Sequence, residues 1–365
     1  MQEETERNNR VYFKTSFEGR ARRQDKLRFK EKNSRSEPFC LLSRVRLGGC
    51  HINKSLNTIC YCPSCKTEKK IPLNVKTLED LLDACCIHTP SCLTDFLEPF
   101  SIFLPVIVGD EVAIERVAYE FCEDAAKEGV LYSEVRYCPH LLSSTFSPVK
   151  TCSGPLTPRE VVMSVNRGLS RGSVDFKITV RSILCWSSDI LQLCLEFQRY
   201  GVVGIDVAGD ESTGLAAPEI VATFRNAVEY GVHRTAHAGE AGPAKNVQIA
   251  MTDMMAQRIG HGYHVVDDPD IYAECLRRRI HFEACPYSSI LTGSVPLTDI
   301  KHPIVRFAED NANFSISRDD PTLIQKTLDQ EYDFFFSLQI RSERHLSLCL
   351  TSKLQCRTLF FPAAR

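Results

Sequence analysis

Residues 202–240 read VVGIDVAGDESTGLAAPEIVATFRNAVEYGVHRTAHAGE and contain the repeating unit that decides the fold. Residues 202–207 and 232–235 are short apolar runs of the kind that form buried strands. Between them, residues 218–230 place apolar side chains at the i, i+3, i+4 spacing of an amphipathic helix. A strand, a helix and a second strand in this order predict part of a parallel sheet covered by helices.

The same alternation continues on both sides of this unit. Further strands are predicted at residues 130–137, 176–184, 258–259, 280–283 and 313–316, and further helices at residues 113–127 and 268–279. So many strand–helix units predict an α/β fold, a closed (β/α)8 TIM barrel. Barrels of this kind build their active sites at the C-terminal ends of the strands.

The composition is typical of a soluble globular protein. Hydrophobic residues make up 43% of the 365 residues and charged residues 25%, and the net charge is -2. This balance gives no reason to expect nucleic acid or an anionic membrane as a partner. No apolar run approaches the roughly 18 residues of a membrane span. The polar N-terminus does not resemble a secretory signal. A cytoplasmic protein with reduced cysteines is therefore predicted.

The N-terminal region has a different character from the rest of the chain. It is rich in Lys and Arg and has few apolar positions, so residues 1–38 are predicted to be a disordered basic arm. The barrel is predicted over residues 39–336.

His237 and Glu240 follow the strand-like run at residues 232–235, beside the small residues Ala238 and Gly239. An imidazole at a strand end, with a carboxyl three positions later, favours a catalytic or metal-binding pair over a core histidine and a surface glutamate. Glu240 suits a general acid, because a carboxyl buried near a substrate nitrogen can carry a proton.

Two further blocks place polar groups at predicted strand ends. His261 lies between two glycines and is predicted in a loop, where it could orient or deprotonate a metal-bound water. For His264, a supporting role beside the site and a purely structural role remain equally open. In Asp319-Asp320-Pro321, the proline disfavours helical backbone at Asp320, so one carboxylate can bind a metal while the other contacts substrate. A helix N-cap followed by proline is compatible with this reading.

Together these blocks resemble the adenosine deaminase family, the zinc-dependent hydrolytic deaminases of purine nucleosides in the amidohydrolase superfamily. The resemblance extends from about residue 73 to residue 332. The matching segments are Ala118-Tyr119-Glu120-Phe121, Glu134-Val135-Arg136-Tyr137-Cys138-Pro139-His140, Ala208-Gly209-Asp210-Glu211, Arg258 to His264 and Asp319-Asp320-Pro321.

The resemblance implies a metal-dependent hydrolase barrel and a role for each matched residue. His237 and Asp319 correspond to Zn2+ ligands. Glu240 corresponds to the acid that protonates the purine ring, and His261 to the base that positions the attacking water. Asp320 and Gly209 would contact the purine. The implied reaction converts adenosine and 2'-deoxyadenosine to the inosine products, with ammonia leaving, in purine salvage.

The chain departs from the family in three places. The first strand of the family carries His-x-His-x-Asp-Gly, where this chain has Arg44-Val45-Arg46-Leu47-Gly48-Gly49. Arg44 and Arg46 have no lone pair for zinc and would repel it, so reduced or lost activity is predicted. Arg318 would place a cation beside Asp319. Residues 337–365 lack the family's C-terminal helical pattern and are predicted to form a divergent tail.

Three readings remain open at this point. The chain is an adenosine deaminase with compromised activity, an inactive relative that binds nucleosides or a protein partner, or another amidohydrolase such as an adenine or AMP deaminase.

Overall fold

The structure is a computed structural model, and it describes residues 77–145, 155–185, 187, 189–209, 211, 217–296 and 301–339. All of these residues belong to one compact unit, residues 41–365. The basic arm, the stretch with Arg44, Arg46 and Gly48, and the tail from residue 340 onward lie outside the described residues. The division into arm, barrel and tail therefore stays a prediction.

A parallel sheet forms the centre of this unit. The described residues contribute seven strands, each hydrogen-bonded to the next in chain order. They are β1 (Tyr132–Tyr137), β2 (Thr179–Cys185), β3 (Val202–Asp206), β4 (His233–Ala238), β5 (Arg258–His261), β6 (His281–Ala284) and β7 (Asn313–Ile316). Every pairing is parallel. This order is the one that a (β/α)8 barrel requires, so the predicted fold class is confirmed.

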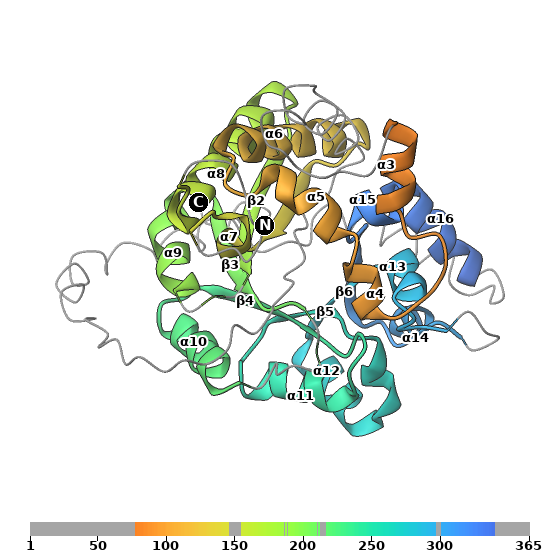
Figure 1. Cartoon of the computed structure of the whole chain (residues 1–365). Helices are drawn as coiled ribbons and strands as arrows, with labels where there is room; N and C mark the ends of the chain where they lie inside the picture. Colours follow the sequence, from red (N-terminus) through yellow and green to blue (C-terminus); the bar gives the residue numbers. More distant parts are fainter. Residues whose placement is uncertain are drawn as a thin grey trace, which may run out of the picture. The chain divides into compact units, whose positions relative to one another are not determined.

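Helices connect the strands and pack outside them (Figure 1). The long ones are α6 (Glu111–Lys127), α8 (Pro158–Asp175), α10 (Pro218–Glu229), α12 (Pro269–Arg278) and α16 (Leu328–Gln339). The shorter ones are α3 (Leu78–Cys85), α4 (Leu93–Leu97), α5 (Phe100–Ile107), α7 (Pro139–Leu142), α9 (Ile190–Phe197), α11 (Ala244–Thr252), α13 (Pro286–Leu291), α14 (Pro303–Glu309) and α15 (Pro321–Ile324). Short 3-10 turns lie at Gln198–Tyr200 and Tyr263–Asp267.

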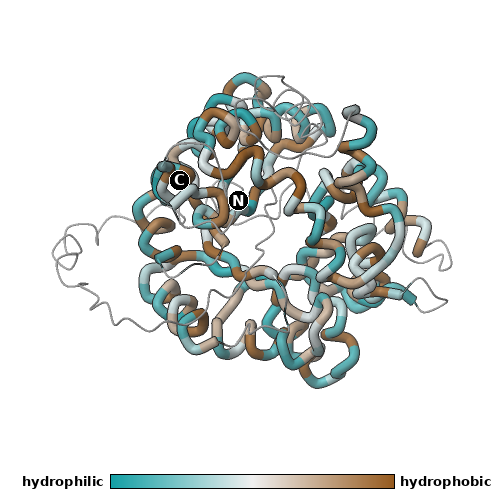
Figure 2. The backbone as a smooth tube through the Cα atoms, in the orientation of Figure 1, coloured by the Kyte–Doolittle hydropathy of each residue, from teal (hydrophilic) through white to brown (hydrophobic). Residues whose placement is uncertain are grey.

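The helices are amphipathic, as their spacing predicts. Figure 2 shows teal and brown alternating along α6, α8 and α10, because one face of each helix packs against the rest of the protein and the other meets solvent. Their ends carry ordinary capping residues. Thr157 closes a capping box at the start of α8, with its side chain accepting from the backbone of Glu160.

Two details of the sequence prediction are wrong. His237 was expected after its strand, but β4 extends through Ala238 and contains it. His261 was expected in a loop, but it is the last residue of β5. Both strands extend beyond their apolar runs and include buried polar residues. A polar residue can lie in a buried strand when the protein interior supplies a charged or hydrogen-bonding partner.

Close packing of α6 against α8 depends on Gly168. A Cβ at this position would clash with the backbone oxygen of Glu115 and lie 2.8 Å from Cβ of Ala118. Gly168→Ala is therefore expected to lower the free energy of unfolding by about 1–3 kcal/mol through overpacking. Urea denaturation measures this difference. The exposed Ser170→Ala on the same helix is the control, and an equal effect of both variants would contradict the packing argument.

Candidate active site

Side chains with chemical function collect at the C-terminal ends of β3 to β7. His237 lies near the end of β4, and its partner across the sheet is Gly260 of β5. A Cβ at Gly260 would come within 2.9 Å of the His237 ring, so the glycine leaves the room that this imidazole occupies. His261 ends β5, and its ring centroid is 5.2 Å from that of His237. The two histidines are thus neighbours at one end of the sheet.

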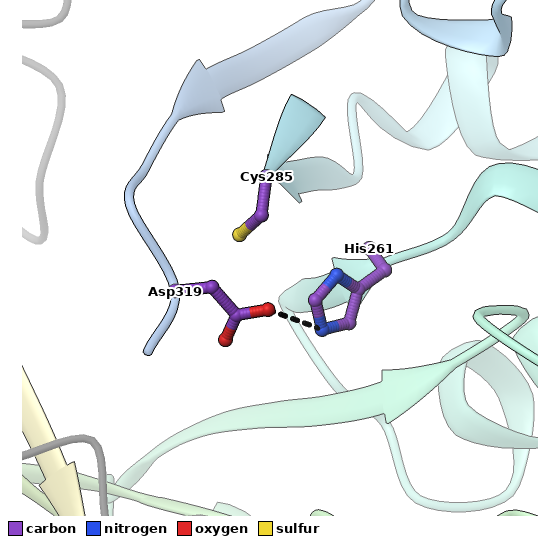
Figure 3. A group of neighbouring side chains, drawn as sticks. All are labelled: His261, Cys285 and Asp319. Carbon is purple, nitrogen blue, oxygen red and sulfur yellow. Dashed lines mark ion pairs between the residues drawn. The ribbon is translucent and has the colours of Figure 1, made fainter. Parts of the chain in front are cut away.

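Glu240 and Asp319 complete the cluster around His261. The Nε2 atom of His261 is 3.4 Å from Oε2 of Glu240 and 3.8 Å from Oδ2 of Asp319. All three side chains are buried. Figure 3 shows the Asp319 carboxylate pointing toward His261 with Cys285 nearby, and one ligand atom from each of these three residues lies within 4.8 Å of the others. The structure therefore brings His237, Glu240, His261 and Asp319 together.

Two residues of the cluster have left-handed backbone. The φ angle is 65° at His261 and 60° at Asp319, a conformation that residues with a Cβ adopt at an energetic cost. Strain of this kind gathers at functional sites, where the position of the side chain matters more than local stability. The surrounding parallel strands hold both residues in place.

The backbone of Asp320 is not helical, as the following proline predicts, with φ -107° and ψ 82°. It also precedes α15 as its N-cap, with Pro321 in the first turn, but its side chain makes no capping hydrogen bond. The Asp320 side chain is buried, as is that of its sequence neighbour Asp319. The non-helical backbone at Asp320 and the N-cap followed by proline are therefore both present, and the Asp320 side chain does not cap the helix.

The remaining predicted residues lie around this cluster. Gly209 follows β3 with a φ of 137°, a backbone angle that favours glycine. His264 forms an ion pair with Asp267 at 2.7 Å, and its backbone N–H donates to the carbonyl of Gly239. The guanidinium of Arg318 pairs with Glu128 at 2.5 Å.

A buried carboxylate orients His237. Asp206 at the end of β3 lies 3.1 Å from Nδ1 of His237, and its other oxygen is 3.0 Å from Nε of Arg136. Burial alone would raise the pKa of Asp206, but the charges of His237 and Arg136 outweigh it and hold the pKa below its usual value. An imidazole with one nitrogen held by a carboxylate presents the other nitrogen in a fixed direction, as metal-binding histidines do.

The charges continue beneath the cluster as a network. Arg136 also pairs with Glu283 of β6, and Arg258 of β5 joins Glu283 and Glu134, each at 2.5 Å. Burial would raise the pKa of Glu283, yet Arg136 and Arg258 hold it well below its usual value. The group therefore remains ionised, and the network balances buried carboxylates with guanidinium groups.

The sequence pattern predicts no role for Asp206, Arg136, Glu283 or Arg258. The available signal was the presence of charged residues inside otherwise apolar strand runs, because a buried charge needs a partner. Which residue pairs with which depends on strand register. The sequence alone does not supply that register.

Glu331 of α16 lies behind the site, fully buried, and accepts a hydrogen bond from the backbone of Tyr287 at 3.0 Å. Burial raises the pKa of Glu331 to about 8, and the charge of Asp319 adds to the effect. Because this pKa is raised above its unfolded value, the carboxyl's contribution to stability is complete below about pH 4 and is lost as the pH rises through about 8.

Glu331→Gln removes this titration and keeps an acceptor for Tyr287. Between about pH 5 and about pH 7, the unfolding free energy of the wild type is expected to fall relative to the variant by up to about 1.4 kcal/mol per pH unit. Urea denaturation at several pH values measures the difference. A difference that does not change with pH would contradict the assignment.

The described residues suit part of a divalent-metal site. An oriented imidazole, His237, and the carboxylate of Asp319 are the donor types that zinc accepts, and His261 and Glu240 lie beside them. Two protein ligands are fewer than the three that a catalytic zinc usually has. The positions at which the resemblance expects two more, Arg44 and Arg46, are outside the described residues.

Two findings concern the rest of the chain. Among the residues that the structure describes, none of the helices has the length and apolar character to cross a bilayer. Within the same ranges no cysteine is part of a disulfide.

A family model and named relatives match most of this chain. The family model described as adenosine deaminase matches residues 58–354, which extends past the predicted barrel boundary at residue 336. Adenosine deaminase of Gallus gallus is 46% identical over 275 residues, covering 73% of this chain and 77% of the relative. The enzyme of Xenopus tropicalis is 45% identical over 276 residues, with the same coverage.

Solved structures share the fold. Adenine deaminase from Arthrobacter aurescens superposes with a TM-score of 0.66 at 21% identity, covering 86% of this chain and 93% of that chain. The N6-mAMP deaminase of Arabidopsis gives a TM-score of 0.69 at 22% identity, covering 86% and 90%. At such identities these likenesses establish the barrel, and the closer sequence relatives establish the family. The chain belongs to the adenosine deaminase family.

Proposed function

We propose that this protein is a zinc-dependent hydrolase that deaminates adenosine and 2'-deoxyadenosine to inosine and 2'-deoxyinosine, acting in purine salvage in the cytoplasm. The observation that carries the proposal is the convergence of His237, Glu240, His261 and Asp319 at one end of the sheet. The relatives at 45–46% identity, which are named adenosine deaminases, supply the substrate class.

His237 and Asp319 would hold the metal, with further ligands coming from outside the described residues. When bound, zinc supplies a water that is acidic enough to react near neutral pH. An amidohydrolase from Burkholderia ambifaria with the same fold, at a TM-score of 0.63, was solved with bound Zn. Asp206 keeps the His237 ring in the orientation that a ligand needs.

The other residues move protons and bind the purine. His261 accepts a proton from the attacking water, and Glu240 donates a proton to the ring nitrogen beside C6, so that the ring becomes a better electrophile. As the C–O bond at C6 forms, His261 returns its proton to the amino group. The C–N bond then breaks and ammonia leaves, while the new C6 hydroxyl gives its proton to Glu240 as the carbonyl forms. Asp320 and the backbone N–H of Gly209 hold the purine edge during these steps.

Arg44 and Arg46 bear on the activity, because both replace expected zinc ligands. The deciding experiment combines metal analysis of the purified full chain with the loss of adenosine absorbance. One tightly bound zinc per chain and steady turnover support the proposal. A chain without zinc or turnover that gains both in the variant Arg44→His, Arg46→His, Gly48→Asp would show that the barrel is intact and the arginines disable it.

The alternative functions are separated by two further measurements. A panel of adenosine, 2'-deoxyadenosine, adenine and AMP distinguishes a nucleoside deaminase from an adenine or AMP deaminase. Calorimetry with inosine distinguishes an inactive nucleoside-binding protein from one that does not bind at all. No feature of the described residues favours the inactive alternative over the enzyme.

A further inference from the structure

The carboxylate of Glu211 binds the backbone of the loop that contains Glu240. It accepts hydrogen bonds from three successive backbone N–H groups, those of Gly239 at 2.9 Å, Glu240 at 2.6 Å and Ala241 at 3.2 Å. The side-chain amide of Asn246 in α11 donates a fourth at 2.9 Å. Successive N–H groups that point into one concavity form an anion-binding nest, and here the anion comes from the chain itself.

The backbone around Glu211 has little room for anything else. Gly239 has a φ of 66°, and a Cβ there would lie 2.7 Å from Cγ2 of Val247. A Cβ at Gly242 would overlap Oε2 of Glu211 and Nδ2 of Asn246. The turn is therefore shaped by two glycines so that this carboxylate fits beneath it.

Glu211 also links the segments that follow β3 and β4, beyond the point where the two strands pair. The register of β3 and β4 contains only the pairs Gly204 with His233 and Ile205 with Arg234. Beyond these pairs, the backbone N–H of His237 still donates to Val207 at 2.8 Å. Farther along, Glu211 supplies the connection between the segment that contains Gly209 and the loop that contains Glu240.

We propose that Glu211 is a positioning residue for the deamination. It fixes the backbone of Glu240, whose carboxyl lies 3.4 Å from Nε2 of His261, and it sets the spacing between Glu240 and the purine contact at Gly209. The inference rests on the proposed function, because that function gives Glu240 its role as the acid. It adds a residue that acts through Glu240 without touching substrate or metal.

The chemistry of the four contacts makes the proposal specific. All four partners are N–H donors, so only an acceptor with two charged oxygens satisfies them. In Glu211→Gln the size is unchanged, but the new amide group faces two donors. A residue that only filled space would tolerate this change, whereas a positioning carboxylate would not. Asn246→Ala removes one contact of the four and is the graded comparison.

The test uses the full chain and three readouts: zinc content, kcat and KM for adenosine, and hydrogen exchange of the backbone amides of residues 239–241. In Glu211→Gln we expect kcat to fall by about 100-fold, as misplacement by about 1 Å does elsewhere, with KM changed less than about threefold. Zinc content should match the wild type. Exchange at residues 239–241 should be at least about tenfold faster, and exchange in β4 before His237 unchanged. Asn246→Ala should show a smaller change of the same kind.

The outcomes separate this inference from the proposed function. A wild type that never deaminates adenosine refutes the function, whereas the exchange of amides 239–241 reports on Glu211 in either case. Wild-type exchange in Glu211→Gln would overturn the inference. So would a loss of kcat that followed a proportional loss of zinc, because Glu211 would then act through the metal.

Discussion

Replacing Glu240 by Gln is expected to reduce kcat for adenosine by about 100- to 10,000-fold, the range that a positioned general acid contributes. The amide keeps the shape of the side chain, which is buried against His261, but it cannot transfer a proton to the purine ring as a carboxylic acid does. The loss should appear in kcat more than in KM, since the group acts in the transition state. Steady-state kinetics with adenosine measures the loss.

Metal content provides the control for this variant. Glu240 is not one of the expected ligands, so zinc should remain at the wild-type level in Glu240→Gln. The exposed Glu219→Gln in α10 makes the same chemical change away from the site and should retain full activity. Retention of activity within tenfold in Glu240→Gln, a loss below the ~100-fold minimum for a general acid, would rule out Glu240 as the acid.

Replacing Arg136 by Met is expected to lower the free energy of unfolding by about 3–5 kcal/mol, because it leaves buried carboxylates without their partner. Arg136 pairs with both Asp206 and Glu283, and all three side chains are at most 7% exposed. Methionine fills a similar volume, so the loss reports the charge and not a cavity. Chemical denaturation monitored by fluorescence or circular dichroism measures it.

An exposed ion pair is the matched comparison. Arg159 pairs with Glu196 at the surface, where its side chain is 56% exposed. Arg159→Met should lower the free energy of unfolding by less than about 1 kcal/mol, since water replaces the lost partner. Similar losses of unfolding free energy in the two variants would show that the buried ion-pair network stabilises the protein no more than an exposed ion pair does. Arg136→Met should also weaken zinc binding, because Asp206 orients His237.

Much of the fold follows from local sequence pattern. The apolar runs and the amphipathic spacing of residues 202–240 predicted β3, α10 and β4 to within a few residues. Strand ends were harder to predict, because β4 continues past Thr235 through the polar residue His237, which a hydropathy pattern reads as loop. Their place in a strand depends on partners contributed by neighbouring strands.

The site was predictable only as separate motifs. Each of His237, Glu240, His261 and Asp319 stood out because of its small or polar neighbours, and their convergence required the parallel topology. The supporting charges were not predictable in the same way. Arg136 and Glu283 are 147 positions apart, and they meet because β1 and β6 both contribute to the interior. The left-handed backbone at His261 was not predicted either, because a positive φ is uncommon in residues other than glycine, although histidine adopts it more often than most.

The backbone conformation of His261 and Asp319 lowers the stability of this barrel while it positions two functional side chains. Each residue holds a φ angle that only glycine adopts without penalty, at about 1–3 kcal/mol per position. Selection for heat resistance would therefore favour glycine at positions 261 and 319. Each such variant would lack an imidazole or a carboxylate at the mouth of the barrel, and would resist heat better but have no activity.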